Sequence, residues 1–210
     1  MNSLIEKLNP QQQLAISAPP GPTLVLAGPG SGKTRVLTYR IAYLISVMNV
    51  PAYNILAVTF TNKAAKQMAE RVTHLIGEHA EGVWLGTFHS ICGRILRREA
   101  DLLPVNRNFV IFDTDDQEAL MKQILKDNSI DEKLLRPASV LAAISKAKND
   151  LLGPENYPVK DFRDEQVKRL YALYQQKLVQ NNAMDFDDML VYTNHLFETY
   201  PIVRETYAHK

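Results

Sequence analysis

The segment that most constrains this chain is the glycine-rich stretch A-G-P-G-S-G-K-T at residues 27–34. An apolar run at residues 23–26 precedes it and predicts a buried strand, and apolar residues at helical spacing follow it to about Met48. A strand, a glycine-rich turn and a helix form the setting of a phosphate-binding loop, in which backbone N–H groups at a helix N-terminus surround an anion. The stretch departs from the pattern G-x-x-x-x-G-K-[ST] at Ala27, which stands at the first glycine position.

This pattern predicts binding of a nucleoside triphosphate. Lys33 would bring a positive charge to the outer phosphates, and the Thr34 hydroxyl would be a ligand of Mg²⁺. The alternative is an ordinary glycine-rich turn with a solvent-exposed lysine. The candidate nucleotide-binding residues of the loop are Ala27, Gly28, Pro29, Gly30, Ser31, Gly32, Lys33 and Thr34, with Lys33 and Thr34 as candidate catalytic residues and Thr34 as the candidate metal ligand.

Composition limits the classes of partner. The 24 Lys and Arg residues barely exceed the 23 Asp and Glu residues, so any nucleic-acid contact has to come from local clusters. The 210 residues contain no apolar run long enough to span a bilayer, and the N-terminus lacks the features of a signal peptide. The single cysteine, Cys92, excludes an intrachain disulfide. We therefore expect a cytoplasmic protein that does not act at a membrane.

The order of elements predicts an α/β fold. Apolar segments at residues 55–60 and 83–88 read as further buried strands, and helices separate them. Such alternation predicts a parallel sheet covered on both faces, with the carboxyl ends of its strands along one edge. After about Ser90 the pattern becomes helical, apart from a strand at residues 109–112, and residues 114–117 read as a capping box.

One expected feature of a phosphate-loop enzyme is missing from the sequence. Such an enzyme needs a second strand that ends in an acidic residue for Mg²⁺. After the phosphate loop, no strongly apolar strand of this chain ends in an Asp-Glu or Asp-Asp pair. We therefore expect a piece of a longer protein, with an incomplete sheet and an exposed seam.

Five segments in order resemble a known family. They are L-N-P-Q-Q-Q at residues 8–13, A-G-P-G-S-G-K-T-R at 27–35, T-F-T-N-K-A-A at 59–65, G-T-F-H-S at 86–90 and M-D-F-D-D-M at 184–189. Together they resemble the N-terminal motifs of superfamily 1 DNA helicases of the UvrD/Rep/PcrA type. The resemblance implies a P-loop NTPase fold with an incomplete, RecA-like parallel sheet. It assigns residues 1–89 to an ATP-binding lobe and residues 90–210 to an inserted, all-helical subdomain.

The resemblance also implies roles for individual residues. Gln12 would hydrogen-bond the adenine edge of ATP, Arg35 would lie near the nucleotide, and the acidic residues at 185–188 would be structural. Two loops would line the track of single-stranded DNA, and their residues are Phe60, Thr61, Asn62, Lys63, Thr87, Phe88 and His89. Aromatic rings stack on bases regardless of sequence, whereas hydroxyl and amide groups hold phosphates.

The implied activity is ATP-dependent DNA unwinding or translocation, with ATP and Mg²⁺ as cofactors, in DNA repair or replication. The implied partners are single-stranded DNA, DNA junctions and the C-terminal lobes of the same protein. Because those lobes are missing here, we expect the chain alone to be inactive as an enzyme.

Several alternatives stay open at this point. Phe60 and Phe88 are by pattern alone more typical of core residues, and His89 of a helix start. The chain could also be the helicase half of a helicase–nuclease. Two further readings are a P-loop phosphotransferase and a pure binding module whose helical half contacts proteins.

Overall fold

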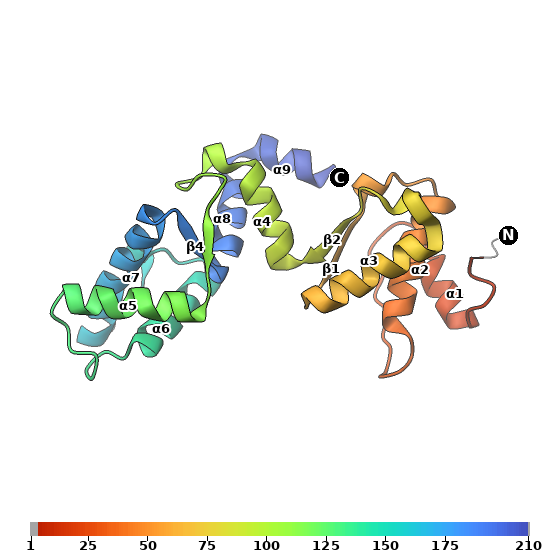
Figure 1. The fold of residues 1–210 in the computed structure, drawn as a ribbon. Helices are drawn as coiled ribbons and strands as arrows, with labels where there is room; N and C mark the ends of the chain where they lie inside the picture. The colour runs from red at the N-terminus through yellow and green to blue at the C-terminus, as the bar shows by residue number, and fades with distance from the viewer. Residues whose placement is uncertain (1–3, 210) are drawn as a thin grey trace. The chain divides into compact units, whose positions relative to one another are not determined.

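The computed structural model describes residues 4–209, and the chain divides into two compact units (Figure 1). The first unit comprises residues 4–91 and 205–209 of the described chain, and the second unit comprises Cys92–Arg204. The identification of these units as an ATP-binding lobe and an inserted subdomain stays a prediction. Among residues 4–209, no helix combines the length and apolar character that crossing a membrane requires.

The first unit alternates helices with two short strands. Its elements are α1 (Pro10–Ile16), α2 (Lys33–Ser46), a 3-10 helix at Ala52–Asn54, β1 (Leu56–Thr59), α3 (Asn62–Ile76), a 3-10 helix at Gly77–Ala80, and β2 (Trp84–Thr87). The two strands are parallel and in register from Leu56 opposite Trp84 to Thr59 opposite Thr87. This pairing confirms both predicted strands, shortened at their ends, and places their carboxyl ends at the same edge.

The strand predicted before the phosphate loop is wrong in this structure. Residues 23–26 form no strand, and the side chains of Leu24 and Leu26 are 84% and 86% exposed. A strand needs a neighbour for its N–H and C=O groups, and β1 and β2 pair only with each other among the described residues. The apolar character of residues 23–26 is therefore not enough to form a strand or to bury these side chains.

Helices cover one face of the small sheet. Ile55 packs with Ile41 of α2 and with Met68 and Val72 of α3 in a buried cluster, which Ala57 and Leu85 of the strands join. Successive strand residues point to opposite faces. Leu56, on the other face, is 58% exposed. The predicted cover on both faces is thus wrong at this position.

The second unit is mainly helical, but the prediction of an all-helical subdomain is wrong, because two short strands pair within it. Its elements are a 3-10 helix at Ala100–Leu102, β3 (Val110–Phe112), α5 (Thr114–Asp127), α6 (Pro137–Asn149), a 3-10 helix at Pro154–Asn156, α7 (Phe162–Gln180), β4 (Ala183–Asp185) and α8 (Phe186–Thr199). Two further helices cross the borders between the units in sequence, α4 (Phe88–Arg98) and α9 (Pro201–Ala208).

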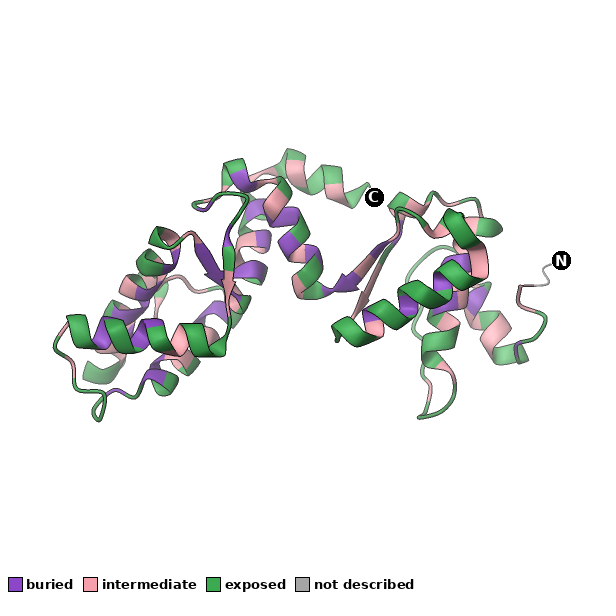
Figure 2. Cartoon of the chain, viewed as in Figure 1, coloured by how far each residue is buried: buried purple, intermediate pink, exposed green. Residues whose placement is uncertain are grey.

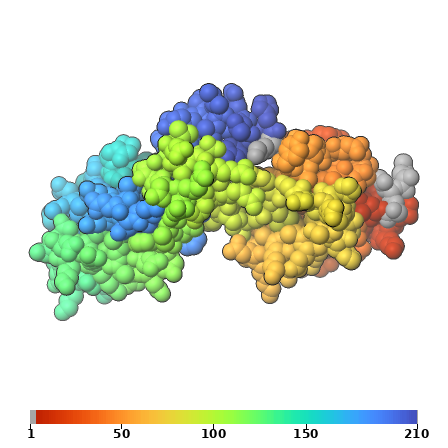
Figure 3. Space-filling view, turned by 45° about the horizontal axis from the view of Figure 1, so that its top comes forward, coloured from red at the N-terminus to blue at the C-terminus, as the bar shows by residue number. Residues whose placement is uncertain are grey.

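Each main helix of the second unit has a buried and an exposed face (Figure 2). The largest core cluster joins α5, α6 and α7, and the green atoms of α5 lie against the blue atoms of α7 in the space-filling view (Figure 3). Leu125, Leu170 and Tyr174 are fully buried in this cluster. Burial of each such side chain contributes roughly 1.5–3 kcal/mol.

Two local features of the second unit differ from the prediction. The strand β4 pairs in parallel with β3, and its three residues are all buried. This strand was not predicted, because three residues are too few to show a strand period. Asp113, rather than Thr114, caps α5, since its Oδ1 accepts hydrogen bonds from the N–H groups of Asp115 and Asp116 at 2.9 and 3.0 Å.

Candidate nucleotide and nucleic-acid sites

The phosphate loop ends in a helix start that has no side-chain cap. Gly32 occupies the N-cap position of α2 with φ of +85°, and Gly30 has φ of +74°. These backbone conformations favour glycine. Gly32 has no side chain that could accept hydrogen bonds from the first N–H groups of α2. These N–H groups and the helix dipole together favour an anion at the start of the helix. Ala27 has no positive φ, so the departure from the glycine pattern at this position costs no backbone strain.

The Lys33 side chain folds back onto the loop. Its Nζ donates hydrogen bonds to the carbonyl oxygens of Ala27 and Gly28 at 3.0 and 2.8 Å. Ser31 Oγ donates to the same Gly28 oxygen at 2.7 Å. A bound phosphate would therefore replace these two carbonyl oxygens as the hydrogen-bond acceptor of the Lys33 ammonium group. Thr34, in the first turn of α2, is exposed.

Gln12 lies directly against the loop. Its Nε2 donates to the Ser31 carbonyl at 3.0 Å, and its Oε1 accepts from the Asn9 N–H at 3.3 Å. The second bond belongs to a capping box at the start of α1, in which Asn9 is the N-cap and Pro10 the first helical residue. A Cβ on Gly32 would lie 3.0 Å from Gln12 Nε2, so the glycine also permits this close approach.

A cavity of about 530 Å³ lies beside these residues. Pockets of this size accept small organic ligands. It is bounded by α1, by the segment before the loop, by the loop and by α2, and its walls include Gln12, Ala15, Val25, Gly28, Lys33 and Leu37. Five of the ten candidate nucleotide-binding residues line this cavity: Gln12, Ala27, Gly28, Ser31 and Lys33.

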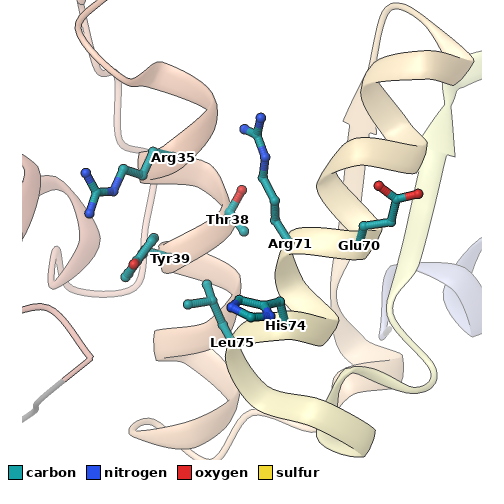
Figure 4. Close-up of a pocket in the computed structure, with 7 residues that line it drawn as sticks. All are labelled: Arg35, Thr38, Tyr39, Glu70, Arg71, His74 and Leu75. Atoms are coloured by element: carbon teal, nitrogen blue, oxygen red, sulfur yellow. The ribbon is translucent and has the colours of Figure 1, made fainter.

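Arg35 lies elsewhere, in a pocket of about 390 Å³ between α2 and α3 (Figure 4). Arg35 and Tyr39 project together from α2, with the guanidinium carbon 5.5 Å from the ring centroid, within the range of a cation–π contact. The other lining residues were not predicted, because they are separated in sequence and form no contiguous motif. They are Thr38, Tyr39, Glu70, Arg71, His74 and Leu75.

The two predicted DNA-contact loops lie next to each other at the carboxyl ends of β1 and β2. Thr87 Oγ1 donates to Asn62 Oδ1 at 3.4 Å, which joins the two loops directly. Thr61 caps α3 by accepting from the Ala64 N–H, and Lys63 is exposed in the first turn of that helix. His89 is half-buried near the start of α4.

Both candidate stacking residues are exposed. The Phe60 side chain is 95% exposed and that of Phe88 is 54% exposed. The alternative that they are core residues at strand ends is therefore wrong in this structure. Ser90 holds the second loop in place, because its Oγ accepts from the Thr87 N–H at 2.8 Å and donates to the Thr87 carbonyl at 2.9 Å.

The acidic motif at residues 185–188 belongs to the interior of the second unit. Asp185 and Asp188 are each 2% exposed, and the Lys148 ammonium lies 2.6 Å from Asp185 Oδ2 and 2.8 Å from Asp188 Oδ1. Tyr174 Oη donates to Asp185 at 3.0 Å, and Gln175 Nε2 donates to Asp188 at 2.9 Å. Each carboxylate also accepts a hydrogen bond from the backbone N–H of the other aspartate, and these two bonds form the capping box at the start of α8. This burial supports the structural role that was expected for the motif.

Burial changes the protonation behaviour of this cluster. It raises the pKa of Asp188 to about 6, although the Lys148 ammonium acts to lower it. Burial also raises the pKa of Tyr192 to about 12 and the pKa of Tyr174 further. The cluster holds two carboxyl groups against one ammonium group. Because its pKa is raised, Asp188 is protonated more readily than an ordinary aspartate.

Comparison with known proteins places this sequence in one family. The family model described as "UvrD/REP helicase N-terminal domain" matches residues 8–210. The chain belongs to the UvrD/REP helicase family. Curated relatives of this family cover the whole chain: the ATP-dependent DNA helicase PcrA of Staphylococcus epidermidis and that of Bacillus subtilis are each 49% identical to it, and PcrA of Staphylococcus aureus is 47% identical.

The match concerns the N-terminal part of these UvrD/REP relatives. The chain spans 29% of the length of each of the three relatives. The resemblance that the five sequence segments indicated is therefore confirmed at the level of the family. The roles of individual residues in the UvrD/REP chain stay predictions.

Proposed function

We propose that this chain is the nucleotide-binding and DNA-contacting part of an ATP-dependent DNA helicase or translocase. The observation that carries the proposal is the combination of two sites in the first unit. One is the uncapped, glycine-rich start of α2 with Lys33 and Gln12 beside it, and the other is the joined pair of loops that expose Phe60 and Phe88. The relatives named as ATP-dependent DNA helicases support the same activity.

The first site suits ATP. The backbone N–H groups of the loop would hold the phosphates, and the Lys33 ammonium would leave the Ala27 and Gly28 carbonyls to contact them. Gln12 presents a donor and an acceptor, which fits the adjacent N6 and N7 groups of adenine. Mg²⁺ would bind the Thr34 hydroxyl and would neutralise charge on the phosphates.

The second site suits single-stranded DNA. Two exposed phenylalanines beside hydroxyl, amide and ammonium groups provide stacking surfaces for bases and partners for phosphates. A DNA junction would present such a single strand. We place the protein in the cytoplasm, and repair or replication of DNA is the process that this activity would serve.

The rest of the motor would come from residues outside this chain. The exposed apolar residues at 24–26 and Leu56 support an incomplete RecA-like sheet, whose remaining strands would bring the acidic residue for Mg²⁺. The second unit would be the helical insertion of this lobe. In this proposal the C-terminal lobes complete the enzyme, and the 210 residues alone bind ligands without unwinding DNA.

Replacing Lys33 with alanine tests the nucleotide half of the proposal. A charge-assisted hydrogen bond contributes about 1.5–3 kcal/mol, so Lys33→Ala is expected to weaken binding of Mg-ATP by roughly 10- to 150-fold. Isothermal titration calorimetry on the 210-residue chain measures this change. The control is Lys66→Ala, which removes an exposed lysine from α3 and should leave the affinity within twofold. Equal affinity of the Lys33→Ala variant and the wild type, or no ATP binding by the wild type, would contradict the proposal.

A further inference from the structure

Arg40 joins two helices of the first unit at a place that no motif marks. It lies in the third turn of α2 and is half-buried. Its Nη1 donates hydrogen bonds to the carbonyl oxygens of Ile16 at 2.5 Å and of Ala18 at 2.6 Å. Arg40 and these two residues are 24 and 22 positions apart in the sequence, so the contacts are tertiary and not local.

The Ile16 carbonyl is that of the last residue of α1, and the Ala18 carbonyl lies just beyond the C-cap residue Ser17. The last carbonyls of a helix have no partner within the helix and form the negative end of its dipole, where a guanidinium group is favourable. A helix of seven residues is too short to be stable alone in water. The position of α1 therefore depends on tertiary contacts, and the Arg40 bonds and the fully buried Ile16 side chain are such contacts.

The other end of α1 carries Gln12. Gln12 and Ile16 are one helical turn apart, about 6 Å along the axis. The capping box between Asn9 and Gln12 fixes the start of the helix, and the bond from Gln12 Nε2 to the Ser31 carbonyl ties it to the phosphate loop. α1 thus links Arg40 to the loop through a single stiff turn.

We propose that Arg40 is a positioning residue that sets the Gln12 amide against the phosphate loop and so determines the preference for adenine nucleotides. This inference depends on the function proposed above, because it takes Gln12 as the residue that reads the base. Arg40 itself does not contact the nucleotide. Guanine carries a carbonyl oxygen where adenine carries an amino group, so a displaced Gln12 amide loses the ability to tell the two apart.

The test compares ATP with GTP in the 210-residue chain. For Arg40→Ala we expect the ratio of the dissociation constants for GTP and ATP to fall by about fivefold or more. The affinity for GTP, which is held through its phosphates, should change by less than twofold. Arg40→Lys keeps the charge and should recover part of the ratio, whereas a merely structural defect would weaken both nucleotides alike.

A matched control uses the same end of α1. Ser17 Oγ donates only to the neighbouring Gln13 carbonyl, so Ser17→Ala perturbs this helix end without touching the Arg40 contacts. It should leave the nucleotide ratio unchanged. If Ser17→Ala lowers the ratio of the GTP and ATP dissociation constants as much as Arg40→Ala does, the proposed role of Arg40 is wrong.

Amide hydrogen exchange provides a readout that needs no nucleotide. Arg40→Ala should speed exchange at residues 12–17 and at Ser31 by about fivefold or more, and leave residues 65–76 of α3 unchanged. Unchanged exchange in α1 would overturn the positioning role even if nucleotide binding is lost. A wild-type chain that binds neither nucleotide would contradict the proposed function instead, and the exchange result would then decide the positioning role by itself.

Discussion

Replacing Lys148 with methionine is expected to lower the free energy of unfolding by about 3–5 kcal/mol at pH 7. Lys148 is 1% exposed, and its ammonium group contacts both Asp185 and Asp188. Methionine has a similar volume, so the loss comes mainly from two buried carboxyl groups that no longer face a positive charge. Urea unfolding of the 210-residue chain, followed by far-ultraviolet circular dichroism, measures the change.

The deficit should depend on pH in a defined direction. The pKa of Asp188 in the folded protein is raised to about 6 from an ordinary value of 3.8, so the folded state binds this proton more tightly than the unfolded state. Its contribution to stability is therefore present below about pH 3.8 and is lost as the pH rises to about 6. Without Lys148, whose ammonium group lowers the pKa of Asp188, the Asp188 carboxyl group takes up its proton more readily still. The Lys148→Met deficit should be smaller at pH 5 than at pH 7.

An exposed ion pair supplies the control for this prediction. Lys122 lies 2.7 Å from Glu118, one turn away on α5, and both side chains are well exposed. Such pairs contribute little, and Lys122→Met should change the free energy of unfolding by less than about 0.5 kcal/mol. If Lys148→Met is no worse than this control, or if its deficit grows at pH 5, the account of the buried cluster is wrong.

Local signals in the sequence predicted the elements whose causes are local. Asn9 and Pro10 mark the start of α1 because a cap and a preset φ act within one turn. The glycines of the phosphate loop have the positive φ angles that the motif requires at Gly30 and Gly32. The two paired strands and α3 also follow from short-range pattern, and they place the DNA-contact loops at one edge.

The features that sequence analysis missed depend on distant partners. The run at residues 23–26 is apolar, yet no described strand pairs with it. β4 exists because β3, more than 70 residues earlier in the chain, pairs with it. Nothing around Lys148 indicates a buried lysine, since its partner Asp185 lies 37 residues away. Arg40 was passed over for the same reason, because its acceptors precede it by 22 and 24 residues.

Replacing both Phe60 and Phe88 with alanine is expected to weaken binding of single-stranded DNA by about 2–6 kcal/mol, since stacking contributes roughly 1–3 kcal/mol per base. Phe60 is almost fully exposed and Phe88 is half exposed, so their removal should lower the stability of the fold only slightly. Fluorescence anisotropy of a labelled oligodeoxythymidine at low salt, with the 210-residue chain as titrant, measures the loss. Mg-ATP binding should be unchanged in the same variant.

Tyr53 provides a matched aromatic control for the two phenylalanines. It is 63% exposed and lies in the 3-10 helix before β1, at the opposite end of that strand from Phe60. If stacking at the carboxyl edge holds the DNA, Tyr53→Ala should change the affinity by less than twofold. An equal loss in the Tyr53→Ala variant would mean that exposed aromatic surface binds DNA without a defined site. Unchanged affinity in the double variant would remove the two phenylalanine rings from the DNA track and would contradict stacking as the basis of this site.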